Sequence, residues 1–172
     1  MRNPKRSQLI EEAIKFLVFK IDKSGDNPKP VVLHSIRVGL YLDDCGYNKE
    51  VVIAGVLHDL LEDSETIPEE IKDKFGQKVT SLVQACSFDK QLKDKKKRYF
   101  QSFERCLKAG RPALLIKAAD FLENSYYYQF AEGRELKLWL LEKLKHFLDH
   151  SEKIIGKETV WQELGEQHKI LT

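Results

Sequence analysis

The sequence predicts an all-α fold, and two features carry that prediction. Apolar residues recur every three or four positions along nearly the whole chain, which is the spacing of one helix face. No segment shows the strict alternation of apolar and polar residues that is typical of a half-buried strand. The length of 172 residues suits one domain with a substantial core. We therefore expect residues 1–172 to form a single helical bundle.

The periodic segments place the helices in order along the chain. The expected helices cover residues 7–22, 31–42, 49–61, 66–75, 78–87, 90–109, 113–130 and 135–150, followed by a helical tail. Turn-forming residues 23–30 end the first helix, in which Leu9, Ala13 and Leu17 share one face. The helix over 49–61 is apolar on nearly all sides, so we expect it to be the central, buried helix.

Capping and turn residues set further helix boundaries. Thr66 and Glu69 match a capping box, and Pro68 lies in the first turn, which predicts a helix start at Thr66. Gly110 followed by Pro112 marks the end of one helix and the beginning of the next.

Composition excludes several classes of protein. The net charge of +2 gives no general reason to expect binding to nucleic acid. No apolar run approaches the ~20 residues that span a membrane. Cys45, Cys86 and Cys106 are widely spaced and form no Cys-x-x-Cys pair, which indicates a reduced, cytoplasmic protein. The sequence leaves open whether the chain forms a homodimer.

The most informative segment is residues 58–63, which follow the apolar part of the third expected helix. On a continuous helix, His58 and Glu62 share one line of the surface, and Asp59 and Asp63 share the adjacent line. Four polar groups then gather beside the core, and a metal ion with an activated water would offset the cost of burying them. The alternative is a helix end that returns to solvent.

Three separated motifs continue this pattern. They are His34, residues 58–64 (HDLLEDS) and residues 117–124 (KAADFLEN), in the order His…His-Asp…Asp. This order resembles the HD superfamily of metal-dependent phosphohydrolases. It is more similar still to the hydrolase domain of the RelA/SpoT group and its stand-alone Mesh1-type relatives. The resemblance covers roughly residues 5–130 and implies an HD-domain helical bundle.

The resemblance also implies a role for each motif residue. One divalent cation, commonly manganese in this group, would be bound by His34, His58, Asp59 and Asp120. Two imidazoles and two carboxylates suit a borderline first-row ion.

The remaining motif residues would serve water and substrate. Glu62 and Asp63 would orient or deprotonate the attacking water. Substrate binding is expected for Asn124, for Lys117 and for Lys23, with Asn124 on ribose or phosphate. Lys117 stands one turn before Asp120, so it either reaches a phosphate or pairs with that carboxylate.

The sequence differs from the family on the side that recognises the base. Lys23 stands where the family usually has an arginine that packs against the base, and lysine lacks the flat guanidinium face. Val31 and Leu33 replace a tyrosine and an asparagine, and Phe121 replaces a basic residue. These differences predict altered base recognition with the metal and water chemistry intact.

The expected function is manganese-dependent hydrolysis of a phosphorylated nucleotide, by removal of the 3′-diphosphate of a (p)ppGpp-type substrate. The alternatives are phosphomonoester hydrolysis of nucleotides, including NADPH, and a non-catalytic nucleotide-binding sensor. The basic run from Lys93 to Arg98 either holds a polyphosphate or forms a solvated face.

Overall fold

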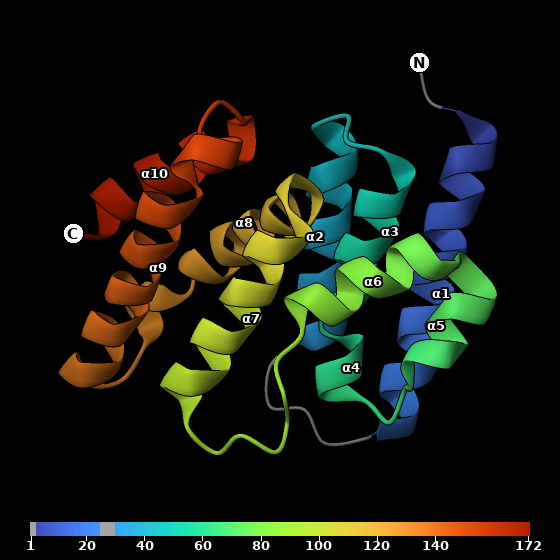
Figure 1. The fold of residues 1–172 in the computed structure, drawn as a ribbon, viewed down its shortest axis with the longest axis horizontal. Helices are drawn as coiled ribbons and strands as arrows, with labels where there is room; N and C mark the ends of the chain where they lie inside the picture. Colours follow the sequence, from blue (N-terminus) through green and yellow to red (C-terminus); the bar gives the residue numbers. More distant parts are fainter. Residues whose placement is uncertain (1–2, 25–29) are drawn as a thin grey trace.

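The structure is a computed structural model that describes residues 3–24 and 30–172, without the side chains of residues 22–24. Every regular element in these ranges is a helix, which confirms the all-α prediction (Figure 1). The helices are α1 (Pro4–Ser24), α2 (Val31–Asp44), α3 (Lys49–Leu57), α4 (Leu60–Asp63), α5 (Pro68–Phe75), α6 (Gln77–Cys86), α7 (Lys95–Ala109), α8 (Arg111–Ser125), the 3₁₀ turn η1 (Tyr128–Phe130), α9 (Arg134–Ile155) and α10 (Thr159–Leu171).

Helix α3 is the buried centre that its all-round apolar sequence predicts. Every residue from Val51 to Leu57 is buried, and α1, α2, α6 and α8 all pack against this helix. Figure 1 shows α3 beside α2 and α1, with α6 crossing in front. A helix without a polar face is stable only when neighbours cover it on all sides.

Two glycines let α2 and α3 approach each other closely. A Cβ added to Gly39 would lie 2.2 Å from Cγ2 of Val56, and one added to Gly55 would lie 2.5 Å from Cδ1 of Leu42. A side chain at Gly39 would meet the short, branched Val56 and its backbone and would push the two helices apart, whereas one at Gly55 would force the end of the Leu42 side chain to move within a packed interior. This close packing sets the distance between the two histidines described below.

The expected continuous helix over residues 49–61 is wrong at its functional end. Helix α3 stops at Leu57, a turn contains His58 and Asp59, and the short helix α4 begins at Leu60. The ring Nδ1 of His58 donates to the carbonyl oxygen of Gly55 at 2.8 Å. A side chain that bonds to a nearby backbone carbonyl competes with the helical ladder, and this competition explains the break.

Two other helices start later than their sequences predict. The cap of α5 is Ile67 rather than Thr66, because the Glu70 carboxylate, not Glu69, accepts from the Ile67 N–H at 3.1 Å. Helix α7 starts at Lys95 rather than at residue 90, because Oδ1 of Asp94 accepts from the backbone N–H groups of Lys96 and Lys97.

The C-terminal helices lie beside α8. Helix α10 packs on α8 and α9, and both C-terminal helices lie at the edge of the molecule remote from α1 (Figure 1). Helix α9 continues to Ile155, beyond the expected residue 150, because Ser151 and Ile155 are buried. Within the described residues, none of the helices has the length and apolar character needed to cross a membrane.

Candidate metal centre and pocket

Three polar side chains from separate parts of the chain meet in the interior. His34 comes from α2, His58 from the turn after α3, and Asp120 from α8, and all three are buried. One ligand atom from each lies within 4.8 Å of the other two. Nε2 of His34 lies 3.3 Å from Nε2 of His58 and 3.2 Å from Oδ1 of Asp120.

Asp59 brings a second carboxylate to the same place. Its Oδ1 lies 3.2 Å from Nε2 of His58, and its Oδ2 lies 3.8 Å from Nε2 of His34. Asp59 is also buried. The four residues that the sequence motifs single out as metal ligands are therefore neighbours in space.

The orientation of His58 fits metal binding. Its Nδ1 must carry the hydrogen, because its partner is a carbonyl oxygen, which only accepts. In the neutral ring, Nε2 then presents a lone pair toward His34, Asp59 and Asp120. Metal-binding histidines are usually fixed in this way by a hydrogen bond from the other ring nitrogen. One cation would satisfy all of these facing acceptors, so the residues fit a divalent metal.

Two further side chains hold Asp120 in place. Nζ of Lys117 lies 3.0 Å from Oδ2 of Asp120, and Nδ2 of Asn124 donates to Oδ1 at 2.6 Å. All three residues lie on α8, where spacings of three and four residues bring side chains together. The ion pair with Asp120 that the sequence allows for Lys117 is therefore formed, and contact of Lys117 with substrate stays a prediction.

Electrostatics set the protonation of the cluster. Burial alone lowers the pKa of His58, but Asp59 and Asp120 outweigh it and raise that pKa to about 9. Burial, followed by the charge of Asp59, raises the pKa of Glu62 to about 8. Burial also opposes ionisation of Asp120, yet Lys117 and the two histidines hold its pKa well below the ordinary value.

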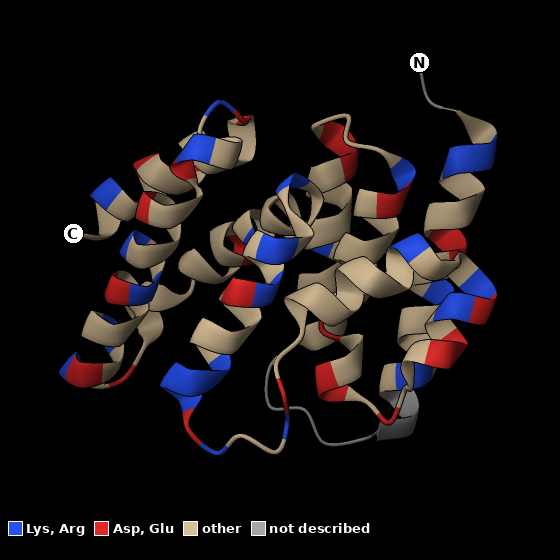
Figure 2. Cartoon of the chain, in the orientation of Figure 1, with Lys and Arg blue, Asp and Glu red and all other residues tan. Residues whose placement is uncertain are grey.

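A pocket of about 390 Å³ opens beside this cluster. Its acidic end consists of Asp59, Glu62 and Asp120, with Lys117 and Asn124 next to them. Its basic wall consists of Lys95, Arg98 and Lys143. Figure 2 shows basic residues on the first turn of α7, beside the start of α9. The pocket thus joins a candidate metal-ligand set to a row of cations, an arrangement suited to a phosphorylated ligand.

Comparisons with known proteins agree with this geometry. The family described as HD domain matches residues 11–137. This chain belongs to the HD-domain family.

Individual relatives show which HD-domain proteins the chain is similar to. The chain is 35% identical over 97 residues to the guanosine-3′,5′-bis(diphosphate) 3′-pyrophosphohydrolase MESH1 of Drosophila melanogaster, covering 55% of this chain and 54% of MESH1. It is 29% identical over 143 residues to the Aquifex aeolicus enzyme of the same description, covering 78% of this chain and 20% of that one. The chain thus spans about half the length of MESH1 and about a fifth of the length of the Aquifex aeolicus enzyme.

One solved structure is similar to this protein over nearly the full chain. It describes a metazoan ortholog of SpoT that hydrolyses ppGpp, and it superposes with a TM-score of 0.83 at 26% identity, covering 99% of this chain and 98% of that one. This HD domain is therefore related to the small Mesh1-like ppGpp hydrolases.

Within this HD domain, the two predicted catalytic carboxylates have different positions. Both lie on α4, but Glu62 lines the pocket whereas Asp63 is not among the described lining residues. The backbone N–H of Phe88 donates to Oε1 of Glu62 at 2.8 Å. Because the helix breaks before Leu60, His58 and Glu62 do not lie on one continuous helix, and the prediction that they share one line of its surface is wrong.

The basic run from Lys93 to Arg98 is divided between the pocket and the surface. Lys95 and Arg98 line the pocket, whereas the side chains of Lys96 and Lys97 are exposed. The Arg98 guanidinium also donates to the Leu92 carbonyl and lies 4.7 Å from the centroid of the Phe88 ring. Arg98 therefore also fixes the loop between α6 and α7.

Several pocket residues carry no signal in the motifs. The aromatic side chains of Phe88, Tyr99 and Trp139 line the pocket, and Lys143 joins them from α9. A weak signal was present, because Leu136, Trp139, Leu140 and Lys143 recur at helical spacing. Nothing in that pattern shows which neighbour the face meets.

The positions that differ from the family have varied surroundings. The side chain of Lys23 lies outside the described residues. Val31 is buried, whereas Leu33 is 46% exposed. Phe121 lines the pocket, and its ring centroid lies 5.4 Å from Nζ of Lys117 and 5.0 Å from Nζ of Lys143.

Proposed function

We propose that this HD domain is a manganese-dependent hydrolase of a phosphorylated nucleotide that acts as a 3′-pyrophosphohydrolase on (p)ppGpp-type substrates. The observation that carries the proposal is the meeting of His34, His58 and Asp120 beside a pocket with a basic wall. The kinship to enzymes described as guanosine-3′,5′-bis(diphosphate) 3′-pyrophosphohydrolases supports this substrate class. A nucleotide is also what a cationic pocket of this size can accommodate.

The proposed ligands are His34, His58, Asp59 and Asp120. The tautomer of His58 and the convergence of two imidazoles with two carboxylates support this set. Mixed nitrogen and oxygen donors suit a borderline first-row ion, and manganese is the ion that the family resemblance implies. When bound, the cation would supply Lewis-acid activation of water and of a phosphate oxygen.

Glu62 is the stronger candidate for the proton acceptor, and Asp63 remains a second candidate. Glu62 lines the pocket beside Asp59, and the Phe88 N–H fixes one of its oxygens. Its other oxygen can take a proton from an attacking water. A pKa near the working pH is what a general base requires, and the pKa of Glu62 is raised to about 8.

The proposed substrate contacts follow from the pocket lining. Asn124 and Lys117 border the acidic end and would contact ribose or phosphate, while Lys95 and Arg98 would neutralise a second phosphate group. We also infer that residues 1–172 form one HD-type domain, which is supported by a core cluster that joins residues from α1 to α10.

A panel of substrates tests the proposal. The purified protein is incubated with Mn²⁺ and ppGpp, NADPH or simple nucleotides, and pyrophosphate and orthophosphate release are measured separately. We expect pyrophosphate and GDP from ppGpp. Orthophosphate release alone, from NADPH or another monoester, would assign the protein to the phosphomonoesterase alternative. Tight nucleotide binding without any release would indicate a sensor.

A further inference from the structure

The pocket has one apolar side that the metal and phosphate chemistry does not use. Leu136, Trp139 and Leu140 of α9 line it, and we call these three residues the α9 shelf. Leu136 is 43% exposed even though it borders the pocket. Trp139 and Leu140 are half-buried and pack against the core on one side, so the shelf anchors to the core and offers its remaining apolar surface to the pocket.

Trp139 is held in position by three neighbours from α7, of which Phe100 meets it at a tilt with ring centroids 6.4 Å apart. The Tyr99 ring meets it edge-on, with centroids 5.8 Å apart and planes at 83°. Nζ of Lys96 lies 4.9 Å from the centroid of the Trp139 ring. Tyr99 is itself fixed, because its hydroxyl donates to the Lys143 carbonyl at 3.1 Å. A ring that is already ordered loses little entropy when a ligand stacks on it.

The shelf shares the pocket with the basic wall. Lys95 and Arg98 come from α7, and Lys143 lies on α9 four residues after Trp139. A ligand that uses both surfaces needs a flat apolar group and anionic groups in one molecule. Among phosphorylated metabolites, a nucleotide has this combination, since its base is flat and its phosphates are charged.

We propose that the α9 shelf is the base-binding subsite of this enzyme, with Trp139 as the residue on which the base stacks. The proposal rests on the proposed function, because it takes the substrate to be a nucleotide. Stacking accepts any base, since every base has a π-face. The guanosine and adenosine forms of one phosphorylated substrate should therefore differ less than about tenfold in kcat/KM.

The first experiment uses the two tryptophans of the chain as internal reporters. Trp161 lies on α10, where its Nε1 donates to Ser151 Oγ at 3.1 Å, and it does not line the pocket. Trp161→Phe leaves Trp139 as the reporter, and Trp139→Phe leaves Trp161 as the matched control. Each variant is titrated with GDP, ADP and pyrophosphate in the presence of Mn²⁺.

We expect both nucleotides to quench Trp139 strongly, and pyrophosphate to compete with them while quenching far less. The Trp161 control should change little with any of these ligands. GDP that saturates the pocket by calorimetry without altering Trp139 fluorescence would overturn the base-binding subsite.

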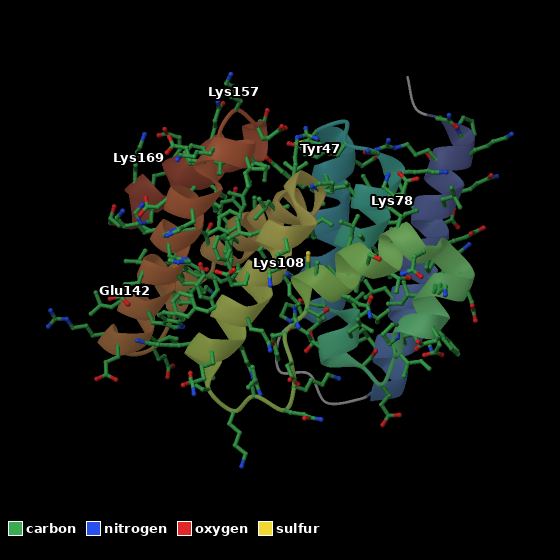
Figure 3. The ribbon with its side chains drawn as sticks, in the orientation of Figure 1. Tyr47, Lys78, Lys108, Glu142, Lys157 and Lys169 are labelled. Carbon is green, nitrogen blue, oxygen red and sulfur yellow. The ribbon has the colours of Figure 1, made fainter. Side chains whose placement is uncertain are left out.

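The second experiment compares two leucines of α9 with similar exposure. Leu136 borders the pocket, whereas Leu138, at 48% exposure, is not among the described lining residues. Leu138 precedes Glu142 by one helical turn, and Glu142, which is labelled on α9 in Figure 3, is exposed. Leu136→Ala should weaken GDP binding several-fold, and Leu138→Ala should leave it within about twofold. Equal effects of the two substitutions would contradict the proposal.

Trp139→Ala measures the size of the stacking contribution. It should weaken GDP binding by about 5- to 150-fold, the range for loss of one base–aromatic stack, while pyrophosphate binding stays within about twofold. Equal weakening of both ligands would show that Trp139 shapes the whole pocket. The leucine pair decides the question if this variant fails to fold.

These results separate the two proposals. If the wild-type protein hydrolyses or binds nucleotides but Trp139 does not respond, the shelf assignment alone is wrong. If the wild-type protein neither binds nor hydrolyses any nucleotide, the proposed function is wrong and the base-binding subsite is wrong with it.

Discussion

The acidic end of the pocket is buried and charged, whereas the basic wall and the α9 shelf combine charged groups with exposed apolar side chains. Asp120 in this acidic end and the adjoining His34 and His58 are each less than 7% exposed, and Nε2 of His34 lies within 3.3 Å of a ring or carboxylate atom of each partner. Leu136 on the shelf is 43% exposed. Buried charges must be paired or bound to a cation, so the acidic end tolerates almost no substitution. The exposed side is less constrained and is where substrate preference can change.

Removal of a proposed metal ligand tests the acidic end most severely. Asp120→Asn should lower Mn²⁺ affinity by more than about 100-fold, because loss of a residue that only orients a ligand already costs 10- to 100-fold. Turnover should become undetectable. Calorimetry and elemental analysis measure the metal, and Glu123→Gln on the same helix is the control. Unchanged Mn²⁺ binding by Asp120→Asn would refute the metal site.

The proton acceptor is tested by two neighbouring carboxylates. Glu62→Gln should keep Mn²⁺ and lose about 10²- to 10⁴-fold in kcat, the usual contribution of a general base. Asp63→Asn is the matched comparison, because it lies next to Glu62 but does not line the pocket. A larger loss of kcat in Asp63→Asn would show that Asp63, rather than Glu62, is the proton acceptor. Loss of Mn²⁺ from either variant would show that the substituted residue is a metal ligand.

Lys117 shows how strongly the acidic end depends on charge balance. Lys117→Met leaves the Asp120 carboxylate buried without its ion-pair partner, which should cost about 3 kcal/mol of unfolding free energy in chelator. Added Mn²⁺ should stabilise the variant more than the wild type, because the cation replaces the missing positive charge. Urea unfolding with and without metal measures this difference. Equal stabilisation of both proteins would mean that the cation and Lys117 act on separate groups.

The pH dependence of metal binding follows from the same cluster. The pKa of His58 is raised to about 9 in the metal-free site, and a ligand imidazole must be neutral. Below that pH a bound cation displaces a proton, so Mn²⁺ affinity should rise between pH 7 and 9, by up to about tenfold per unit. Calorimetry in buffers of different ionisation enthalpy counts the released protons. A flat affinity over this interval would contradict the assigned charge state.

The smallest effect is expected at the basic wall. Lys95→Met should raise KM about two- to fivefold, because an exposed cation contributes roughly 1 kcal/mol or less in water. Lys97→Met is the matched control, since it removes the same charge from the same turn without touching the pocket. The difference should shrink at high salt. Equal KM values for the two variants would show that the basic run from Lys93 to Arg98 forms a solvated face rather than a phosphate-binding site.

The sequence by itself determined the fold class and the central helix, and its resemblance to the HD superfamily named the residues that are proposed to bind a metal. Helical periodicity depends on local spacing, and the residues of a catalytic motif keep their order in the chain whatever their neighbours do. This is why His34, His58, Asp59 and Asp120 could be chosen before their distances were known.

Only the tertiary structure decided where helices break and what lines the rest of the pocket. The interruption at His58 depends on a ring-to-carbonyl hydrogen bond, and the start of α7 depends on the Asp94 cap, neither of which periodicity reports. Trp139 and Lys143 reach the pocket because α9 packs beside α7 and α8. A contact between distant segments is set by packing of whole helices, and no local pattern encodes which face will meet which neighbour.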